Sequence, residues 1–164
     1  MRTRLACERD VPAITAIYND AIERTIASFW TEPRPEGEVA QRFADSGERY
    51  PWVVAEDADD GVVGVAWTQR WNPRQAYDLT IETSVYVAES SRGRGVGRTL
   101  YTDLFERLRG LGYRRVLAGV AVPNDASVRL HESMGMRRVA LFEGIGVKFN
   151  RYLDVGYWQL DLAE

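Results

Sequence analysis

The sequence predicts an α/β or α+β fold built around a mixed sheet, and three observations lead to this prediction. Segments with helical periodicity come first, segments typical of an antiparallel meander follow, and the last part has the order strand–helix–strand–helix–strand. This order is neither that of eight βα repeats nor that of a β-sandwich. The 164 residues, 45% of them hydrophobic, suit a single domain, residues 1–164, that buries roughly 70% of the surface of the unfolded chain.

The first predicted elements are a short strand and a helix. Residues 5–7 are expected in the strand, with the Cys7 side chain buried as a small apolar group. The helix is predicted from Val11 to Thr25, with Asp10 as its N-cap and Pro12 in its first turn. Its apolar residues share one face, and they are Val11, Ile14, Ile17, Ala21 and Ile22.

A shorter helix and a hairpin are predicted next. After a polar segment with two prolines, the helix is expected around Val39 and Phe43. Residues 52–55 and 62–67 are rich in Val, Ala and Trp, and residues 57–61 between them form a turn-rich segment. Two such runs around a turn predict a β-hairpin.

A long strand is predicted from Leu79 to Val87, because two sets of side chains alternate along it. One set is Leu79, Ile81, Thr83, Val85 and Val87, and the other is Thr80, Glu82, Ser84 and Tyr86. Glu82 is therefore expected to face away from Ile81 and toward the side of Tyr86.

The last part of the chain alternates strands with helices. A helix from about Gly95 to Arg109 is predicted to end at Gly110 or Gly112, and its apolar stripe is Val96, Leu100, Leu104, Leu108 and Leu111. The apolar run 116–122 is typical of a strand covered on both faces. Asn124 or Asp125 then caps a helix over residues 126–134. Two final strands are expected near Val139–Phe142 and Tyr157–Leu162.

Composition excludes several classes of protein. The chain has one cysteine (Cys7), one histidine (His131) and one lysine (Lys148), so it has neither an internal disulfide nor a zinc site of cysteines and histidines. Its 21 basic and 24 acidic residues give a net charge of −3, which does not indicate nucleic acid as a partner. No apolar run approaches the roughly 20 residues that span a membrane, and the N-terminus does not resemble a signal peptide. We expect a soluble, cytoplasmic protein that contacts no membrane.

Residues 85–98 predict a phosphate-binding loop between a strand and a helix. Glycines let backbone N–H groups converge on one point, the helix N-terminus adds partial positive charge, and Arg92, Arg94 and Arg98 match phosphate oxygens. The spacing is wrong for a dinucleotide fingerprint, because Arg98 stands where the third glycine belongs. It is also wrong for a Walker loop, because the only lysine is far away in the sequence. The alternative is an ordinary helix start with solvated arginines.

Two motifs resemble those of the GCN5-related N-acetyltransferases (GNAT). Residues 92–97 resemble the Gln/Arg-x-x-Gly-x-Gly/Ala motif, which binds the pyrophosphate of acetyl-CoA in that family, and residues 124–136 resemble a second block. Residues 76–87, 130–132 and 148–155 are similar to phosphinothricin and methionine sulfoximine acetyltransferases. The resemblance implies a mixed, mostly antiparallel sheet of six to seven strands flanked by about four helices. It also implies acetyl-CoA as co-substrate, no metal and a homodimer.

The resemblance implies three groups of cofactor-binding residues. Backbone groups of the strand would hold the pantetheine arm, the loop would bind the pyrophosphate, and the second block would add two polar contacts. These residues are Val85, Tyr86 and Val87; Arg92, Gly93, Arg94, Gly95, Val96, Gly97 and Arg98; and Asn124 and Ser133. Many relatives have a longer basic residue in the place of Ser133. Asn124 also suits a helix N-cap, and the two roles are compatible.

Two catalytic residues follow from the resemblance. Glu82 matches the glutamate proposed as the base that deprotonates the amine, directly or through water. The alternative is a carboxylate on an edge strand paired with a surface arginine. His131 stands where many relatives have a tyrosine that protonates the departing thiolate, and an imidazolium suits that task. Alternatively, His131 is a buried structural residue.

The acceptor is expected to be the α-amino group of an amino-acid-like small molecule. An anionic group of such a substrate needs a cation, and Arg70 and Arg74 are candidates in the loop before the strand, although both also suit solvated loop arginines. The other candidate pocket residues are Gln75, Ala76, Tyr77, Phe29 and Trp30. Residues 150–154, Asn-Arg-Tyr-Leu-Asp, lack the histidine that relatives often have there, which favours methionine sulfoximine or methionine sulfone over phosphinothricin.

The sequence therefore predicts an acetyl-CoA-dependent N-acetyltransferase for amino-acid-like amines. Two alternatives stay open. One is acetylation of another amine, such as a polyamine, an antibiotic or a protein N-terminus, which are cationic and would favour an acidic groove. The other is a non-catalytic acetyl-CoA-binding module, which the presence of Glu82 disfavours.

Overall fold

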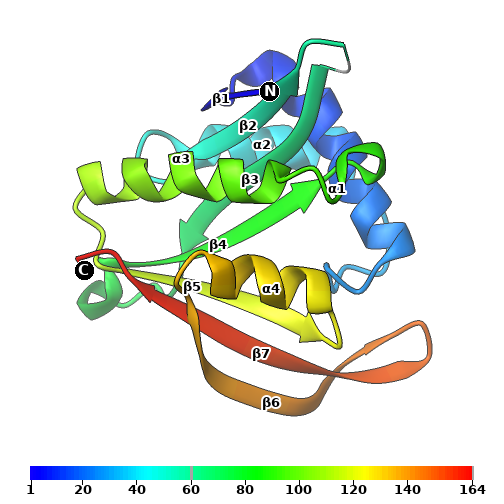
Figure 1. The fold of residues 1–164 in the computed structure, drawn as a ribbon, viewed down its shortest axis with the longest axis vertical. Coiled ribbons are helices and arrows are strands. Elements are labelled where there is room, and N and C mark those ends of the chain that lie inside the picture. The colour runs from blue at the N-terminus through cyan, green and yellow to red at the C-terminus, as the bar shows by residue number, and fades with distance from the viewer. Residues whose placement is uncertain (60, 164) are drawn as a thin grey trace.

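The computed structural model describes residues 1–59 and 61–163, which form one seven-stranded sheet and four α-helices (Figure 1). The strands are β1 (Arg2–Leu5), β2 (Trp52–Asp57), β3 (Gly61–Arg70), β4 (Thr80–Val87), β5 (Arg115–Val122), β6 (Arg137–Lys148) and β7 (Arg151–Asp161). The helices are α1 (Val11–Arg24), α2 (Glu36–Ser46), α3 (Val96–Gly110) and α4 (Asp125–Ser133). Three short 3₁₀ turns, η1 (Glu8–Asp10), η2 (Gln75–Tyr77) and η3 (Glu89–Ser91), complete the regular elements. The predicted class of fold is confirmed.

The two halves of the sheet part in the middle. The strand order is β1-β2-β3-β4-β5-β7-β6, and neighbours are antiparallel except for the parallel pair β4 and β5. That pair extends only from Thr80↔Arg115 to Glu82↔Leu117, after which the strands diverge, as Figure 1 shows. On its other side β4 stays paired with β3 as far as Val87. Beyond Glu82, one edge of β4 therefore faces the opening between the halves.

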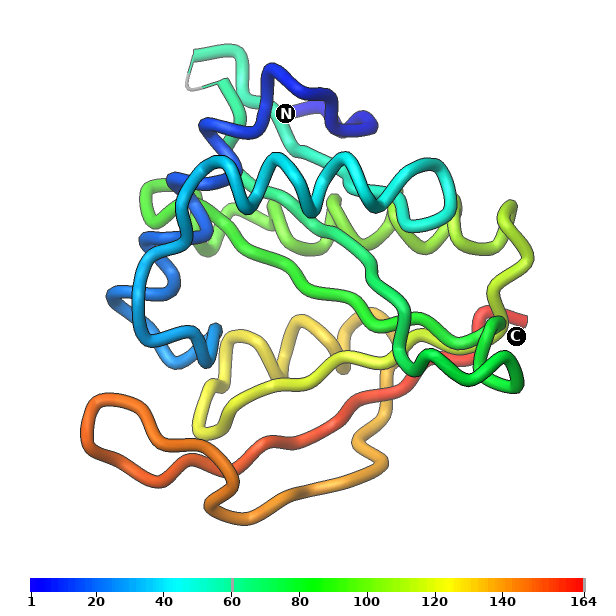
Figure 2. Tube along the Cα trace, turned by 180° about the vertical axis from the view of Figure 1, so that it is seen from behind, coloured from blue at the N-terminus to red at the C-terminus, as the bar shows by residue number. Residues whose placement is uncertain are grey.

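Helices cover both faces of the sheet and create two hydrophobic cores. Helices α3 and α4 lie over the face seen in Figure 1, and α1 and α2 lie over the opposite face, seen in Figure 2. The α3 core takes Ile81 and Val85 from β4, and the α1–α2 core takes Tyr86. The alternation predicted for this strand is confirmed. All five apolar residues of the predicted face of α1 are buried.

Some boundaries differ from the sequence prediction. Strands β6 and β7 contain 12 and 11 residues, because their pairing continues past a bulge between Phe142 and Gly146. Most β6 side chains are exposed, so its sequence lacks the alternation of apolar and polar residues that predicts a half-buried strand. Strand β1 ends at Leu5, so Cys7 lies outside it and is only half-buried, contrary to prediction. Asp60, in the predicted turn, lies outside the described residues.

The structure decides two points that the sequence left open: which glycine ends α3 and which residue caps α4. Helix α3 includes Gly110, and Gly112, with a φ of +83°, follows its end. Leu111, predicted as the last residue of the apolar stripe, lies beyond the end of α3 and is 49% exposed, contrary to prediction. Asn124 caps α4, because its side-chain oxygen accepts a hydrogen bond from the Ser127 N–H at 3.2 Å.

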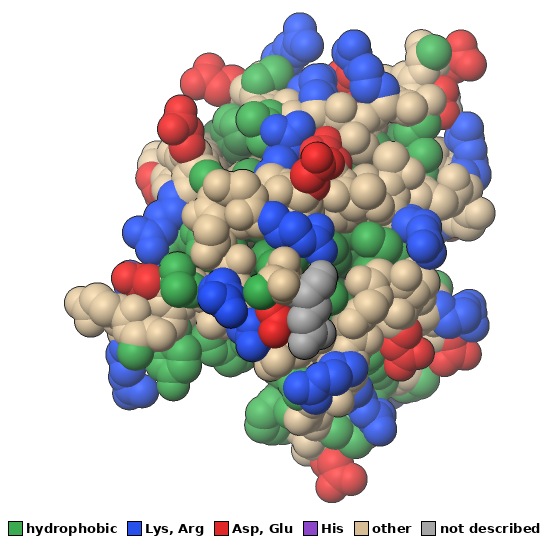
Figure 3. Space-filling view, turned by 60° about the vertical axis from the view of Figure 1, so that its left-hand side comes forward, with side chains coloured by type: hydrophobic (Ala, Val, Ile, Leu, Met, Phe, Trp, Pro, Cys, Tyr) green, Lys and Arg blue, Asp and Glu red, His purple; other side chains and the backbone are tan. Residues whose placement is uncertain are grey.

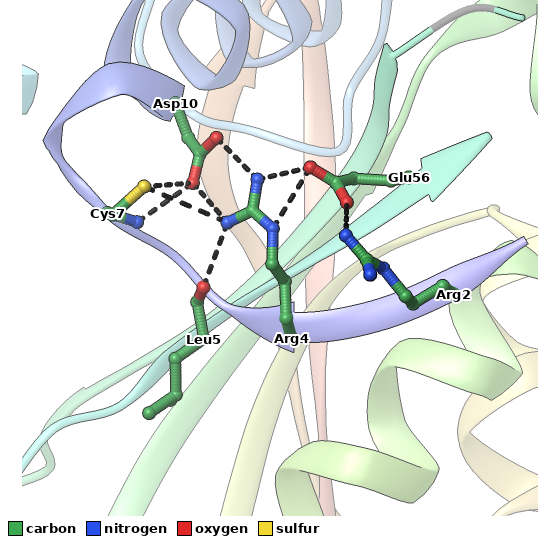
Figure 4. A network of polar contacts seen from close by, with 6 residues as sticks. All are labelled: Arg2, Arg4, Leu5, Cys7, Asp10 and Glu56. Carbon is green, nitrogen blue, oxygen red and sulfur yellow. Dashed lines mark hydrogen bonds and ion pairs between the residues drawn. The ribbon is translucent and has the colours of Figure 1, made fainter. Parts of the chain in front are cut away.

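A network of charged side chains joins β1 to β2 and to the start of α1 (Figure 4). Arg4 donates two hydrogen bonds to the Asp10 carboxylate, at 2.6 and 2.8 Å, and its Nε donates to Glu56 at 3.0 Å. Asp10 also accepts the Cys7 backbone N–H at 2.8 Å. Asp10 occupies the N-cap position of α1, as predicted, but its side chain does not cap the helix, because its carboxylate binds Arg4 and not the helix N–H groups. These contacts lower the pKa of Asp10 to about 2.

The surface is of mixed charge. On the face seen in Figure 3, basic and acidic side chains are interspersed. None of the described helices is both long and apolar enough to cross a membrane. Among the described residues there is no group of three or more His, Cys, Asp or Glu side chains placed to hold a metal ion.

The Arg4 network yields a prediction about stability. Replacing Arg4 with Met should lower the free energy of unfolding at pH 7 by about 3 kcal/mol, because the buried Asp10 carboxylate loses its partner. Since the folded pKa of Asp10 lies below its unfolded value, its contribution is complete above about pH 4 and is lost as the pH falls toward 2. Arg4→Met should lack this loss, and urea unfolding at pH 7, pH 4 and pH 2 measures both effects.

The double variant Arg4→Met, Asp10→Leu is the control, because it removes the unpaired charge and should recover much of the stability. An identical fall in stability between pH 4 and pH 2 in wild type and Arg4→Met would contradict the assignment of this pH dependence to the pair.

Candidate active site

A cavity of about 750 Å³ lies where β4 and β5 part, on the face covered by α1 and α2. Its walls come from the segment between α1 and α2, from α2 and from strands of both halves of the sheet. The lining residues are Tyr18, Ile26, Ala27, Ser28, Phe29, Trp30, Arg42, Trp67, Gln69, Glu82, Ser84, Tyr86, Gly119, Ala121, Val155 and Tyr157. The volume is typical of a site for a small molecule.

Glu82 lies in this cavity at the point where the strands separate. It is the last β4 residue paired with β5, and β4 is a central strand of the sheet. Its Oε2 accepts a hydrogen bond of 2.7 Å from Nε2 of Gln69, the residue opposite it on β3. The alternative of an edge-strand carboxylate paired with an arginine therefore does not describe this residue. Burial and the neighbouring Glu82 carboxylate together raise the pKa of Tyr157.

Arg42 on α2 completes a chain of polar contacts to Glu82. Its guanidinium donates to Oε1 of Gln69 at 2.7 Å, which orients the Gln69 amide so that Nε2 points to Glu82. The guanidinium also lies 4.8 Å from the centre of the Trp67 ring. Among the described lining residues, Arg42 is the cation and Glu82 is the carboxylate. Neither Arg42 nor Gln69 could be predicted as a site residue from the sequence, because no local motif contains them.

Aromatic rings form one wall of the cavity. The Tyr18 ring lies 4.9 Å from Trp67 and 4.9 Å from Tyr86 between centroids, and Trp67 lies 5.0 Å from Tyr86. Burial raises the pKa of Tyr86 well above the usual tyrosine value, so this phenol stays neutral. Contacts of this kind order the rings. Phe29 and Trp30, expected in the pocket from the sequence, also line it.

A second, smaller cavity of about 50 Å³ adjoins the first on the side of α3 and α4. Residues common to both cavities are Ala27, Ser84, Tyr86, Gly119 and Ala121. Val85, Asn124 and His131 line only the smaller one. The large cavity thus lies on one side of the diverging strands and the small cavity on the other. The residues common to both form the thin wall between them.

His131 is buried in the wall of the small cavity, with a relative exposure of 3%. Its Nδ1 donates to the Ser127 carbonyl at 2.7 Å, so Nε2 accepts the Tyr101 hydroxyl at 3.0 Å. Burial lowers the pKa of His131 and raises that of Tyr101. This environment favours a neutral imidazole, whereas the role expected from the sequence needs an imidazolium.

The predicted phosphate loop connects β4 to α3 with a sharp turn. Gly93 and Gly95 have φ values of +75° and +80°, which favour glycine, and α3 begins directly afterwards at Val96. A Cβ on Gly97 would lie 2.8 Å from Leu130, so this glycine permits close packing of α3 on α4. The first N–H groups of α3 lack acceptors within the helix and are available to an anion.

The arginines of the loop are exposed, and two of them contact carboxylates. Arg92 lies 3.3 Å from Asp20, and Arg94 lies 2.8 Å from Asp57. Such exposed ion pairs are weak and exchange readily for other anions. The Ser133 hydroxyl donates to the Leu130 carbonyl at 2.8 Å, at the opposite end of α4 from Asn124. The structure does not bring Ser133 to either cavity.

The remaining predicted substrate residues lie away from the large cavity. Residues 75–77 form η2, before the start of β4, and neither these residues nor Arg74 line the cavity. Arg70 donates to Asp78 at 2.7 Å. Of the pocket residues predicted from the sequence, Phe29 and Trp30 therefore lie with Glu82, and Arg42 is the cation at the cavity.

The arrangement suits an extended ligand that ends in a diphosphate. The open edge of β4 beyond Glu82 offers backbone groups to an amide-containing chain, and the glycine loop and the α3 N-terminus lie at the end of this strand. The small cavity leaves room for a thin group beside the Glu82 cavity. These features fit the pantetheine arm and pyrophosphate of acetyl-CoA.

Comparison with known proteins identifies the family. Residues 17–136 match the model of the acetyltransferase (GNAT) family. The chain is 39% identical over 158 residues to the phosphinothricin N-acetyltransferase of Streptomyces viridochromogenes, over 96% of this chain and 86% of that one. It is 38% identical over 155 residues to the L-methionine sulfoximine/L-methionine sulfone acetyltransferase of Pseudomonas aeruginosa, over 93% and 90% of the two chains.

Its fold also matches the crystal structure of a GNAT superfamily phosphinothricin acetyltransferase from Sinorhizobium meliloti in complex with acetyl-CoA. The TM-score is 0.94 at 32% identity, and the match covers 98% of this chain and 87% of that one. This chain is thus an acetyl-CoA-dependent N-acetyltransferase, and it belongs to the GNAT family.

Proposed function

We propose that this N-acetyltransferase acetylates the α-amino group of an amino-acid-like small molecule of the methionine sulfone, methionine sulfoximine or phosphinothricin type. The observation that carries the proposal is that Glu82 and Arg42, joined through Gln69, line the same aromatic-walled cavity. An amino acid presents a primary amine and a carboxylate, and the cavity presents a base and a cation. The similarity to enzymes named for these substrates supports the same class.

Glu82 is proposed to take a proton from the amine, directly or through water. Acetyl-CoA, when bound, supplies an acetyl thioester whose carbonyl carbon forms the new C–N bond as the C–S bond breaks. Of the two protons that an ammonium group loses on becoming an amide, one ends on the CoA sulfur and one goes to solvent. Gln69 occupies Oε2 of Glu82, so we assign Oε1 to the amine. Backbone N–H groups of residues 85–87 are proposed to orient the thioester.

Loop residues Arg92–Arg98 and the cap residue Asn124 are proposed to bind the cofactor. The N–H groups at the start of α3 would meet the pyrophosphate, and Arg92 and Arg94 would exchange their carboxylate partners for phosphate oxygens. For His131, the buried neutral ring with both nitrogens hydrogen-bonded supports a structural role, in which it ties Tyr101 of α3 to α4.

The test of the acceptor is a panel of amines assayed by release of free thiol from acetyl-CoA. L-methionine sulfone and L-methionine sulfoximine should be turned over, and spermidine should not. Arg42→Met should raise the KM for L-methionine sulfone about tenfold, because it removes the cation proposed to bind the carboxylate. The matched variant is Arg74→Met, whose side chain does not line the cavity.

Turnover of spermidine without turnover of the amino acids would contradict the proposed substrate class. A raised KM in Arg74→Met with an unchanged KM in Arg42→Met would assign the carboxylate to the loop before β4. Tight binding of CoA without turnover of any amine would indicate a non-catalytic module.

Glu82→Gln tests the base. The variant should lower kcat/KM by about 10²-fold at pH 7, because the amide cannot accept a proton, and the loss should shrink at high pH, where the amine is neutral without help. The matched control is Glu106→Gln, an exposed position on α3, which should leave the rate unchanged. A pH–rate profile of Glu82→Gln that parallels the wild type would remove Glu82 from the mechanism.

We also propose that the enzyme is a homodimer through the exposed apolar surface of the β6–β7 hairpin. The exposed side chains there are Val139, Leu141, Phe142, Ile145, Val147, Phe149 and Tyr152. So many exposed apolar side chains on one hairpin are typical of an interface. Light scattering should give twice the chain mass of 18.6 kDa, and Ile145→Glu with Val147→Glu should give the monomer. A wild-type mass of 18.6 kDa would contradict this proposal.

A further inference from the structure

The only lysine of the chain is buried, although lysine is normally a surface residue. Lys148 ends β6 and has a relative exposure of 4%. Its Nζ donates one hydrogen bond to the Ile22 carbonyl and one to the Ser28 carbonyl, each at 2.6 Å. Burial lowers the pKa of this amine. Moving a cation from water to the protein interior costs free energy, even when two backbone carbonyls accept its hydrogen bonds. Solubility therefore does not explain why a lysine stands at this position.

The two carbonyls belong to the end of α1 and to the segment that follows it. Ile22 lies in the last turn of α1. Carbonyl groups there receive no hydrogen bond from within the helix, and the helix dipole favours a cation beside them. Ser28 lies in the segment 25–30, and residues 26–30 all line the large cavity. Lys148 thus joins the C-terminal hairpin to the segment that forms one wall of the proposed acceptor site.

A second contact joins the same two segments. Gly146 is two residues before Lys148 on β6, and both are buried, whereas Val147 between them is exposed. Residues two apart on a strand share a face. A Cβ on Gly146 would lie 2.0 Å from Cε2 of Phe29, so the Phe29 ring lies directly against the strand backbone. The wall is therefore held at Ser28 by Lys148 and at Phe29 by Gly146.

We propose that Lys148 is a positioning residue that fixes the segment 25–30 and thereby the shape of the acceptor site. The proposal rests on the assignment of the large cavity to the acceptor amine. The lysine lies outside the lining of both cavities and acts through Ser28 and Phe29. Its loss mainly affects binding of the acceptor and has little effect on binding of acetyl-CoA, because Ala27 alone of residues 26–30 also lines the small cavity on the other side of β4.

The test compares Lys148→Met with Arg4→Met. Methionine has a similar length and no donor, so it releases the two carbonyls while filling the space. Arg4→Met also breaks a buried polar contact, but its network joins β1, β2 and η1 and touches no cavity residue. Arg4→Met therefore shows how a loss of stability alone affects hydrogen exchange and KM. Both variants are assayed at a temperature at which unfolding curves show them to be folded.

Two measurements are expected to separate the variants. Hydrogen–deuterium exchange should become at least tenfold faster for the amides of Ala27 and Trp30, which are bonded within the segment, in Lys148→Met but not in Arg4→Met. The KM for L-methionine sulfone should rise at least tenfold in Lys148→Met, with the KM for acetyl-CoA within twofold of wild type. Lys148→Arg, which keeps donors, should recover part of the exchange protection.

Unchanged exchange in the segment, or equally faster exchange across the whole chain, would overturn the proposal. A third variant, Phe29→Ala, separates this proposal from the assignment of the cavity. If Phe29→Ala leaves the acceptor KM unchanged, the assignment of the cavity fails. If Phe29→Ala raises that KM and Lys148→Met does not, only the role of Lys148 fails.

Discussion

The divergence of β4 and β5 is the constraint on which the rest of the site depends. Three residue pairs hold the two halves of the sheet together, and beyond Glu82 the backbone of β4 has a strand on one side only. A sheet with an interior opening leaves backbone groups of β4 without a strand partner, and these groups are available to a ligand. Glu82, the open strand edge and the glycine loop all belong to β4 or to the turn that follows it, so one short segment positions the proposed base and the proposed cofactor contacts.

The two sides of the opening are assembled in different ways. The side toward α3 and α4 is built from contiguous segments: a strand end, a loop and a helix start, then a capped helix. The side toward α1 and α2 is built from distant segments, including residues 26–30, Arg42, Gln69 and Tyr157. A local motif keeps its geometry as a unit, because its residues are close together in the sequence. A wall made from many distant segments can change one segment at a time, which suits a family in which the acceptor varies.

This difference also explains what could be predicted from the sequence. The glycine loop, the helix that it opens and the alternation around Glu82 are local patterns, and the structure contains all three. Arg42 and Gln69 reach Glu82 only through the pairing of β3 with β4 and the packing of α2, which no spacing encodes. Asp10 carries a typical N-cap signature, but a tertiary contact with Arg4 outweighed the local preference. The length of β6 was underestimated because an exposed, bulged strand has neither burial pattern nor regular register.

The burial of Lys148 has a chemical consequence for an enzyme that handles a reactive acyl donor. Neutral primary amines on a protein surface are acylated slowly by thioesters without any catalyst, and lysine side chains are the usual targets. Here every other basic side chain is an arginine, which keeps its charge and is not a nucleophile under these conditions. The single ε-amino group lies inside and donates two hydrogen bonds to backbone carbonyls. The positive charge of the protein surface is therefore carried by arginines, whose guanidinium groups do not react with an acetyl thioester.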